Sequence, residues 1–110
     1  MPVVPPATIL IIDDKETALK VRKLVLELAG CSVLTASDVD LAMRLFAASA
    51  VDIVICDQLL EGKTGTELAA EMKRLKPMIP IVIMSGMVER PAGIEHADLF
   101  ICKGKLLLFG

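Results

Sequence analysis

The sequence has little of what several common classes of protein require. It contains no Trp and no Tyr, a single His and only three Cys among its 110 residues. Cys31, Cys56 and Cys102 are odd in number and lack C-x-x-C spacing, which argues against a disulfide framework or a zinc site. The formal net charge is −2 without a basic stripe, so nucleic acid is not expected as a direct partner.

Long apolar runs are also missing. No run approaches the roughly 18 residues that a membrane-spanning helix needs, and the N-terminus, MPVVPPA, lacks the features of a signal peptide. We therefore expect a cytoplasmic protein with no membrane contact. The length suits one domain, residues 1–110, with residues 1–7 as an extended lead-in. The apolar ending LLLFG is consistent with a missing C-terminal continuation.

Short apolar runs alternate regularly with helical patterns along the chain. Hydrophobic residues make up 55% of the sequence, enough for a core on both faces of a sheet. The apolar runs predict strands at residues 8–12, 32–36, 53–56, 81–84 and 99–102. The first helix is predicted over roughly 16–29, where four apolar residues recur at helical spacing: Leu19, Leu24, Val25 and Leu28.

Two possible capping boxes indicate where the next helices begin. Ser37 with Asp40 precedes the second helix, and Thr64 with Glu67 precedes the third. The apolar faces are expected to be formed by Leu41, Leu45 and Ala48 in the second helix and by Leu68, Met72 and Leu75 in the third. Residues 86–98 contain Pro and Gly and can hold only a short fourth helix, and residues 105–109 could only start a fifth.

Strands this short, with little polar alternation, are typical of parallel sheets covered on both faces. Helices between them supply right-handed crossovers. The predicted fold is thus a three-layer α/β domain with a five-stranded parallel sheet. Ligand sites of such sheets lie outside the carboxyl ends of the strands.

Five polar residues stand at those strand ends: Asp13, Asp14, Asp57, Ser85 and Lys103. Any one of them could be a turn former or a helix cap. All five together fit that explanation poorly, because a group of buried carboxylates is costly without compensation. Like charges raise one another's pKa unless a cation intervenes, and Mg²⁺ or Mn²⁺ takes oxygen ligands of this kind.

The carboxylates therefore predict a cation site made by Asp13, Asp14 and Asp57, with the backbone carbonyl of Leu59 as a further ligand. Asp57 follows a very apolar strand and can act as a nucleophile that forms an aspartyl phosphate. Phosphoryl transfer needs mainly positioning and neutralisation of charge. Lys103 could neutralise the phosphoryl group, and the hydroxyl of Ser85 could donate to it.

In this order, these residues resemble the receiver domain of two-component response regulators. Further matches are Leu60 after the candidate phosphoacceptor, Gly65 eight residues after it, and Phe100 three residues before the lysine. The resemblance covers about residues 8–105. It implies a flavodoxin-like fold with strand order 2-1-3-4-5 and a signalling role rather than that of a turnover enzyme.

The resemblance also implies specific roles. A histidine kinase or histidine phosphotransfer protein would phosphorylate Asp57, with Mg²⁺ on Asp13 and Asp14. Lys103 and Ser85 would contact the phosphoryl group. Ser85 would move toward it and Phe100 would turn inward as switch residues. A downstream output domain or effector would respond, and no feature of the sequence sets an oligomeric state.

The sequence also departs from the family pattern. Gly104 and Glu61 stand where the family usually has Pro, and the segment between Ser85 and Lys103 is short, so shortened fourth and fifth helices are expected. Two other functions stay open. One is a degenerate receiver that binds proteins without phosphorylation. The other is a Mg²⁺-dependent phosphohydrolase, which lacks support because Asp13 and Asp14 are adjacent rather than two residues apart.

Overall fold

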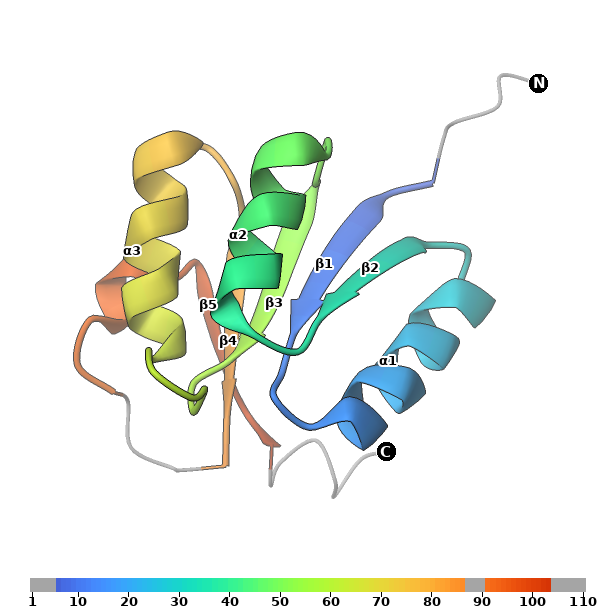
Figure 1. The fold of residues 1–110 in the computed structure, drawn as a ribbon, viewed down its shortest axis with the longest axis horizontal. Helices are drawn as coiled ribbons and strands as arrows, with labels where there is room; N and C mark the ends of the chain where they lie inside the picture. Colours follow the sequence, from blue (N-terminus) through green and yellow to red (C-terminus); the bar gives the residue numbers. More distant parts are fainter. Residues whose placement is uncertain (1–5, 87–90, 104–110) are drawn as a thin grey trace.

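A five-stranded parallel sheet forms the centre of the molecule, in the order β2-β1-β3-β4-β5. The computed structural model describes residues 6–86 and 91–103. The strands are β1 (Thr8–Ile12), β2 (Ser32–Ala36), β3 (Ile53–Asp57), β4 (Ile81–Ser85) and β5 (Leu99–Cys102) (Figure 1). Both the predicted class and the predicted strand order are confirmed, and every strand agrees with its predicted range to within one residue.

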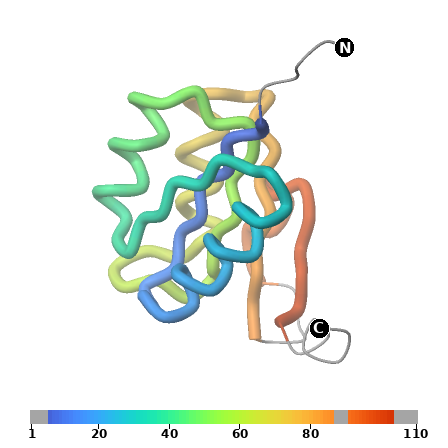
Figure 2. The backbone as a smooth tube through the Cα atoms, turned by 90° about the vertical axis from the view of Figure 1, so that its right-hand side faces the viewer, coloured from blue at the N-terminus to red at the C-terminus, as the bar shows by residue number. Residues whose placement is uncertain are grey.

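Three α-helices cover the sheet in the described part of the chain: α1 (Glu16–Leu28), α2 (Val39–Ala48) and α3 (Gly65–Leu75). Because side chains alternate along a strand, β1 serves both faces. Leu10 and Ile12 belong to the larger core cluster with α2 and α3, whereas Ile9 and Ile11 pack with Leu19 of α1. Figure 2 shows the backbone after a 90° turn, with β5 at the opposite edge of the sheet from β2.

The buried faces of the helices differ in part from those expected. In α3, Leu68 and Met72 are buried as predicted, but Leu75 is exposed. In α2, the buried residues are Ala42 and Phe46, so the expected face of Leu41, Leu45 and Ala48 is rotated. In α1, Leu19 is the one buried residue among the four apolar residues at helical spacing.

Side-chain caps fix where two of the helices begin. At α3 the predicted capping box is confirmed, since Thr64 accepts from the Glu67 amide and Glu67 accepts from the Thr64 amide. At α2 the prediction is wrong, because Asp38 caps the helix by accepting from the Leu41 amide at 2.7 Å. Asp38 stands three residues before that amide, the distance that an N-cap requires.

The predicted short fourth helix is a single 3-10 turn, η1 (Ile94–His96), within residues 91–98. Gly93 precedes it with a φ of 82°, a left-handed conformation that glycine adopts without a steric penalty. The predicted start of a fifth helix at residues 105–109 lies outside the described residues. Among the described helices, none has the length and apolar character to cross a bilayer.

Candidate functional site

The carboxyl ends of β1, β3, β4 and β5 lie along one edge of the sheet, at the bottom of Figure 1. Asp13 follows β1, Asp57 and Ser85 end β3 and β4, and Lys103 follows β5. The parallel register pairs Asp57 with Met84, and Ser85 with Cys102. The sheet therefore brings polar side chains from distant parts of the chain to one place, as the sequence predicted.

Three carboxylates form the acidic part of this edge. Asp13, Asp14 and Asp57 each offer an oxygen, and these oxygens lie within 4.8 Å of one another. Asp13 and Asp57 are buried, whereas Asp14 is exposed and leaves the group open to solvent. An all-oxygen donor set of this spacing is compatible with Mg²⁺. Leu59 pairs with Thr64 in an isolated bridge, and the use of its carbonyl as a ligand stays a prediction.

Lys103 connects two of the carboxylates. Its Nζ lies 2.8 Å from Oδ1 of Asp57 and 3.8 Å from Oδ2 of Asp13, and its side chain is one-quarter exposed. An ammonium at this distance balances the negative charge of Asp57, and the flexible stem of the lysine side chain allows the ammonium to move. The two predicted switch residues lie nearby: Ser85 is buried at the end of β4, and half-buried Phe100 packs against the larger core cluster.

Asp13 has the densest set of partners in the site. Its Oδ1 accepts from the backbone N–H of Lys15 at 3.0 Å, and its Oδ2 accepts from Nη1 of Arg22 at 2.6 Å. Burial by itself raises the pKa of this carboxyl, but the hydrogen bonds from Lys15 and Arg22 and the charge of Lys103 outweigh it, so the pKa is lowered. Asp13 is therefore an ionised, fully buried carboxylate.

Arg22 is the site residue that sequence reasoning missed. It lies in α1, nine residues after Asp13, and its side chain is one-quarter exposed. The sequence feature that could have indicated it was a single arginine in the helix that follows Asp13 and Asp14. That signal was weak, because most arginines on helices face solvent.

The loop after Asp57 is held tightly against the site. A Cβ on Gly65 would lie 2.5 Å from the backbone oxygen of Asp57, so α3 begins directly against the candidate phosphoacceptor. Gln58 is buried, and its amide hydrogen-bonds both the backbone N–H and the hydroxyl of Thr66. The Thr66 hydroxyl in turn donates to the carbonyl of Ala92 at 3.0 Å. This chain of hydrogen bonds connects the residue beside Asp57 to the segment before η1.

Cys56 precedes Asp57 and is buried in β3. Burial raises the pKa of its thiol far above the usual range, and the negative charges of Asp57 and Asp13 raise it further. The thiolate that redox chemistry requires is therefore disfavoured. Cys102 is half-buried.

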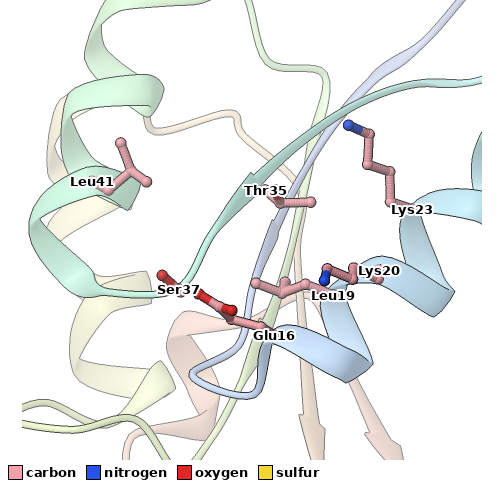
Figure 3. Close-up of a pocket in the computed structure, with 7 residues that line it drawn as sticks. All are labelled: Glu16, Leu19, Lys20, Lys23, Thr35, Ser37 and Leu41. Atoms are coloured by element: carbon pink, nitrogen blue, oxygen red, sulfur yellow. The ribbon is translucent and has the colours of Figure 1, made fainter.

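A separate hollow of about 370 Å³ lies between α1, the end of β2 and the start of α2 (Figure 3). It is lined by Glu16, Leu19, Lys20, Lys23, Thr35, Ser37 and Leu41. Its polar residues come from exposed or half-buried positions, and none of the three acidic site residues lines it. The three acidic residues therefore lie outside this hollow.

Comparisons with known proteins agree with this fold. The model of the response regulator receiver domain matches residues 9–101. The hydrogenase transcriptional regulatory protein HoxA of Cupriavidus necator is 30% identical over 97 residues, which are 86% of this chain and 20% of HoxA. The chain belongs to the response regulator receiver domain family, whose members are signalling domains rather than classical enzymes. It spans less than half the length of the curated relatives it matches.

Solved structures show the same fold. A receiver domain protein of Clostridium thermocellum has a TM-score of 0.77 and 30% identity, over 88% of this chain and 82% of that chain. The response regulator TrrA of Thermotoga maritima, solved with Mg²⁺-BeF, has a TM-score of 0.82 and 23% identity, over 94% of this chain and 99% of that one. TrrA has also been solved in complex with the histidine kinase ThkA.

Proposed function

We propose that this chain is a phosphoacceptor in a two-component phosphorelay, phosphorylated on Asp57 in a Mg²⁺-dependent reaction. The observation that carries the proposal is the contact between Lys103 and Asp57, 2.8 Å long, beside three carboxylates whose oxygens lie within 4.8 Å of one another. These residues come from the ends of three different strands, since Asp13 and Asp14 follow β1, Asp57 ends β3 and Lys103 follows β5. Their meeting is difficult to explain by turn formation alone.

In the proposed reaction, a carboxylate oxygen of Asp57 attacks the phosphorus of a phosphohistidine. The O–P bond forms as the P–N bond breaks, and the imidazole nitrogen keeps the electron pair and then takes a proton. Asp13, Asp14 and Asp57, with the carbonyl of Leu59, would hold Mg²⁺, which neutralises charge on the transferring phosphoryl group. Lys103 would neutralise the charge on another phosphoryl oxygen. The hydroxyl of Ser85 would donate a hydrogen bond to the phosphoryl group.

The proposed donor is a histidine kinase or a histidine phosphotransfer protein. The complex of the similar regulator TrrA with the kinase ThkA supports a partner of this kind. Beside the site, α1 exposes an apolar stripe, in which Val21, Leu24, Val25 and Leu28 are all more than half exposed. An exposed apolar patch of this kind suits docking of another protein. The cytoplasmic location expected from the sequence stays a prediction.

The proposed output is a change of partner affinity when Ser85 and Phe100 rearrange around the phosphoryl group. The effector is either an output domain of the same protein or a separate partner, as the regulatory names of the relatives suggest. One observation favours a second candidate, a phosphorylation-independent binding module. Between β4 and β5, the part of the chain that the structure describes has only the three-residue η1 as a helix, which leaves little to switch.

Intact mass spectrometry after incubation with acetyl phosphate distinguishes the two. The wild type, with and without Mg²⁺, is compared with Asp57→Asn, which keeps the size of the side chain but removes the nucleophile. We expect one phosphoryl adduct that requires both Mg²⁺ and Asp57. A folded wild-type protein that forms no adduct and binds no Mg²⁺ would instead support the binding module.

A further inference from the structure

The most unusual contact of the site is the ion pair between Arg22 and Asp13. The guanidinium reaches from α1 to a fully buried carboxylate, and Nη1 lies 2.6 Å from Oδ2. The same oxygen has Lys103 at 3.8 Å, and the other oxygen accepts from the Lys15 amide. A carboxylate that is proposed to bind a cation is thus already paired with a cation of the chain itself.

The charge balance of the site disfavours a divalent cation and both side-chain cations at the same time. Three carboxylates face two cationic side chains, Arg22 and Lys103, which leaves one net negative charge among these five groups. Addition of a divalent cation with both side chains in place would make the group net positive. Release of one side-chain cation makes the group neutral. Repulsion between cations is strong where burial limits screening by water.

Arg22 is better suited to leave than Lys103. The Lys103 ammonium is bonded to Asp57, where the phosphoryl group would arrive, and its charge is needed there. The guanidinium of Arg22 contacts only Asp13 among the ion pairs of the described residues. Its long side chain starts from a helix surface and is partly exposed, so it can turn into water at low cost.

We propose that Arg22 is a built-in competitor of the divalent cation: it holds Asp13 in the metal-free protein and is displaced when Mg²⁺ binds. This inference rests on the Mg²⁺ site of the proposed function. Arg22 is then a residue that sets the Mg²⁺ concentration at which Asp57 becomes able to accept a phosphoryl group. Because binding linkage is reciprocal, the ion pair weakens Mg²⁺ binding by the same factor by which Mg²⁺ weakens the ion pair.

The first test measures Mg²⁺ binding by isothermal titration calorimetry, since the protein has no Trp or Tyr for a fluorescence titration. Arg22→Gln removes the guanidinium with little effect on helix propensity. Lys23→Gln is the matched control. It makes the same change of charge one residue further along α1, where exposed Lys23 lies beside the hollow of Figure 3. We expect Arg22→Gln to bind Mg²⁺ roughly five- to tenfold more tightly than the wild type, and Lys23→Gln to bind like the wild type.

The second test separates competition from a merely structural role. Urea unfolding is followed by circular dichroism in EDTA and at increasing Mg²⁺. We expect Arg22→Gln to be less stable than the wild type in EDTA, and this difference to shrink as Mg²⁺ rises. A structural ion pair would leave the difference the same at every Mg²⁺ concentration.

The outcomes distinguish this inference from the proposed function. Equal or weaker Mg²⁺ binding by Arg22→Gln, with measurable binding by the wild type, overturns the competitor role and leaves the metal site standing. Absence of Mg²⁺ binding by the wild type, Lys23→Gln and Arg22→Gln alike contradicts the metal site itself, and the competitor role with it.

Discussion

At the scale of single residues, Gly65 shows how closely the backbone packs around the candidate phosphoacceptor. A Cβ there would lie 2.5 Å from the oxygen and 3.1 Å from the carbon of the Asp57 carbonyl group. Backbone atoms cannot turn aside as the end of a flexible side chain can. The glycine is therefore required by the close approach of α3 to β3 and not by an unusual backbone angle.

Gly65→Ala should lower the free energy of unfolding by about 1–3 kcal/mol, the usual cost of overpacking a tight site. Gly86→Ala is the control, because a Cβ at Gly86 would have no atom of the described residues within 4 Å and Gly86 also lies beside the site. Urea unfolding followed by circular dichroism measures both. Equal stability of Gly65→Ala and Gly86→Ala would show that α3 can shift away from Asp57 without cost.

At the scale of elements, Thr66 joins three segments: the loop after β3, α3 and the segment before η1. Its hydroxyl accepts from the side-chain amide of Gln58 and donates to the carbonyl of Ala92, and the residue is almost fully buried. Thr66→Val keeps the shape but leaves both partners without this hydrogen bond. Of these two partners Gln58 is buried, and a buried polar group that loses its partner costs about 1–3 kcal/mol.

We therefore expect Thr66→Val to unfold at a lower urea concentration than the wild type, with a loss of about 1–3 kcal/mol. Hydrogen exchange should also become faster at the amides of residues 92–97. Thr17→Val, the same substitution at an exposed position of α1, should leave both measurements nearly unchanged. If exchange at residues 92–97 is unaffected in Thr66→Val, the hydroxyl does not hold that segment.

The elements themselves were largely predictable from the sequence, and their contacts were not. Apolar runs followed by a polar residue predicted the strands to within a residue, and the order of these polar residues predicted that Asp57 and Lys103 would meet. The rotation of a helix on the sheet depends on tertiary packing, so Leu75 was expected inside and lies outside.

Contacts made by long side chains could not be predicted from the sequence either. Arg22 reaches Asp13 from α1, and Lys76 lies 4.5 Å over the ring of Phe46 while it also donates to the carbonyls of Phe46 and Ser49. No motif or spacing in the sequence singles out either residue. Their positions follow from how the helices pack, which spacing along the chain does not reveal.

At the scale of the whole molecule, we expect several carboxylates to make the fold sensitive to acid. The pKa of Asp98 is lowered by hydrogen bonds from the Lys73 side chain and the Ile81 amide, although burial slightly opposes them. The pKa of Glu67 is lowered by the amide and the hydroxyl of Thr64. The pKa of Asp13 is lowered as well, as its partners outweigh its burial. All three groups bind protons more readily in the unfolded chain than in the folded one.

The lowered pKa values predict that the free energy of unfolding falls in acid. Where the unfolded state binds more protons, the free energy of unfolding falls as the pH falls. The stabilisation by these groups is fully present at pH values well above their ordinary pKa values, 3.8 for Asp98 and 4.5 for Glu67. It is lost as the pH falls through the lowered pKa values that these groups have in the folded protein. Urea unfolding in EDTA, from about pH 7 down to about pH 3, should therefore show a loss of stability that begins near pH 5.

Asp98→Asn tests the contribution of one group to this loss. Asp98 joins α3 to β4 through Lys73 and the Ile81 amide, and its side chain is about half exposed. The asparagine keeps a hydrogen-bond acceptor for the Ile81 amide but has no charge to lose in acid. We expect Asp98→Asn to be less stable than the wild type at pH 7 and to lose less stability between pH 5 and pH 3, so that the two curves converge. Parallel curves would mean that the ion pair with Lys73 is too well solvated to matter, and that the acid sensitivity comes from the other two groups, Asp13 and Glu67.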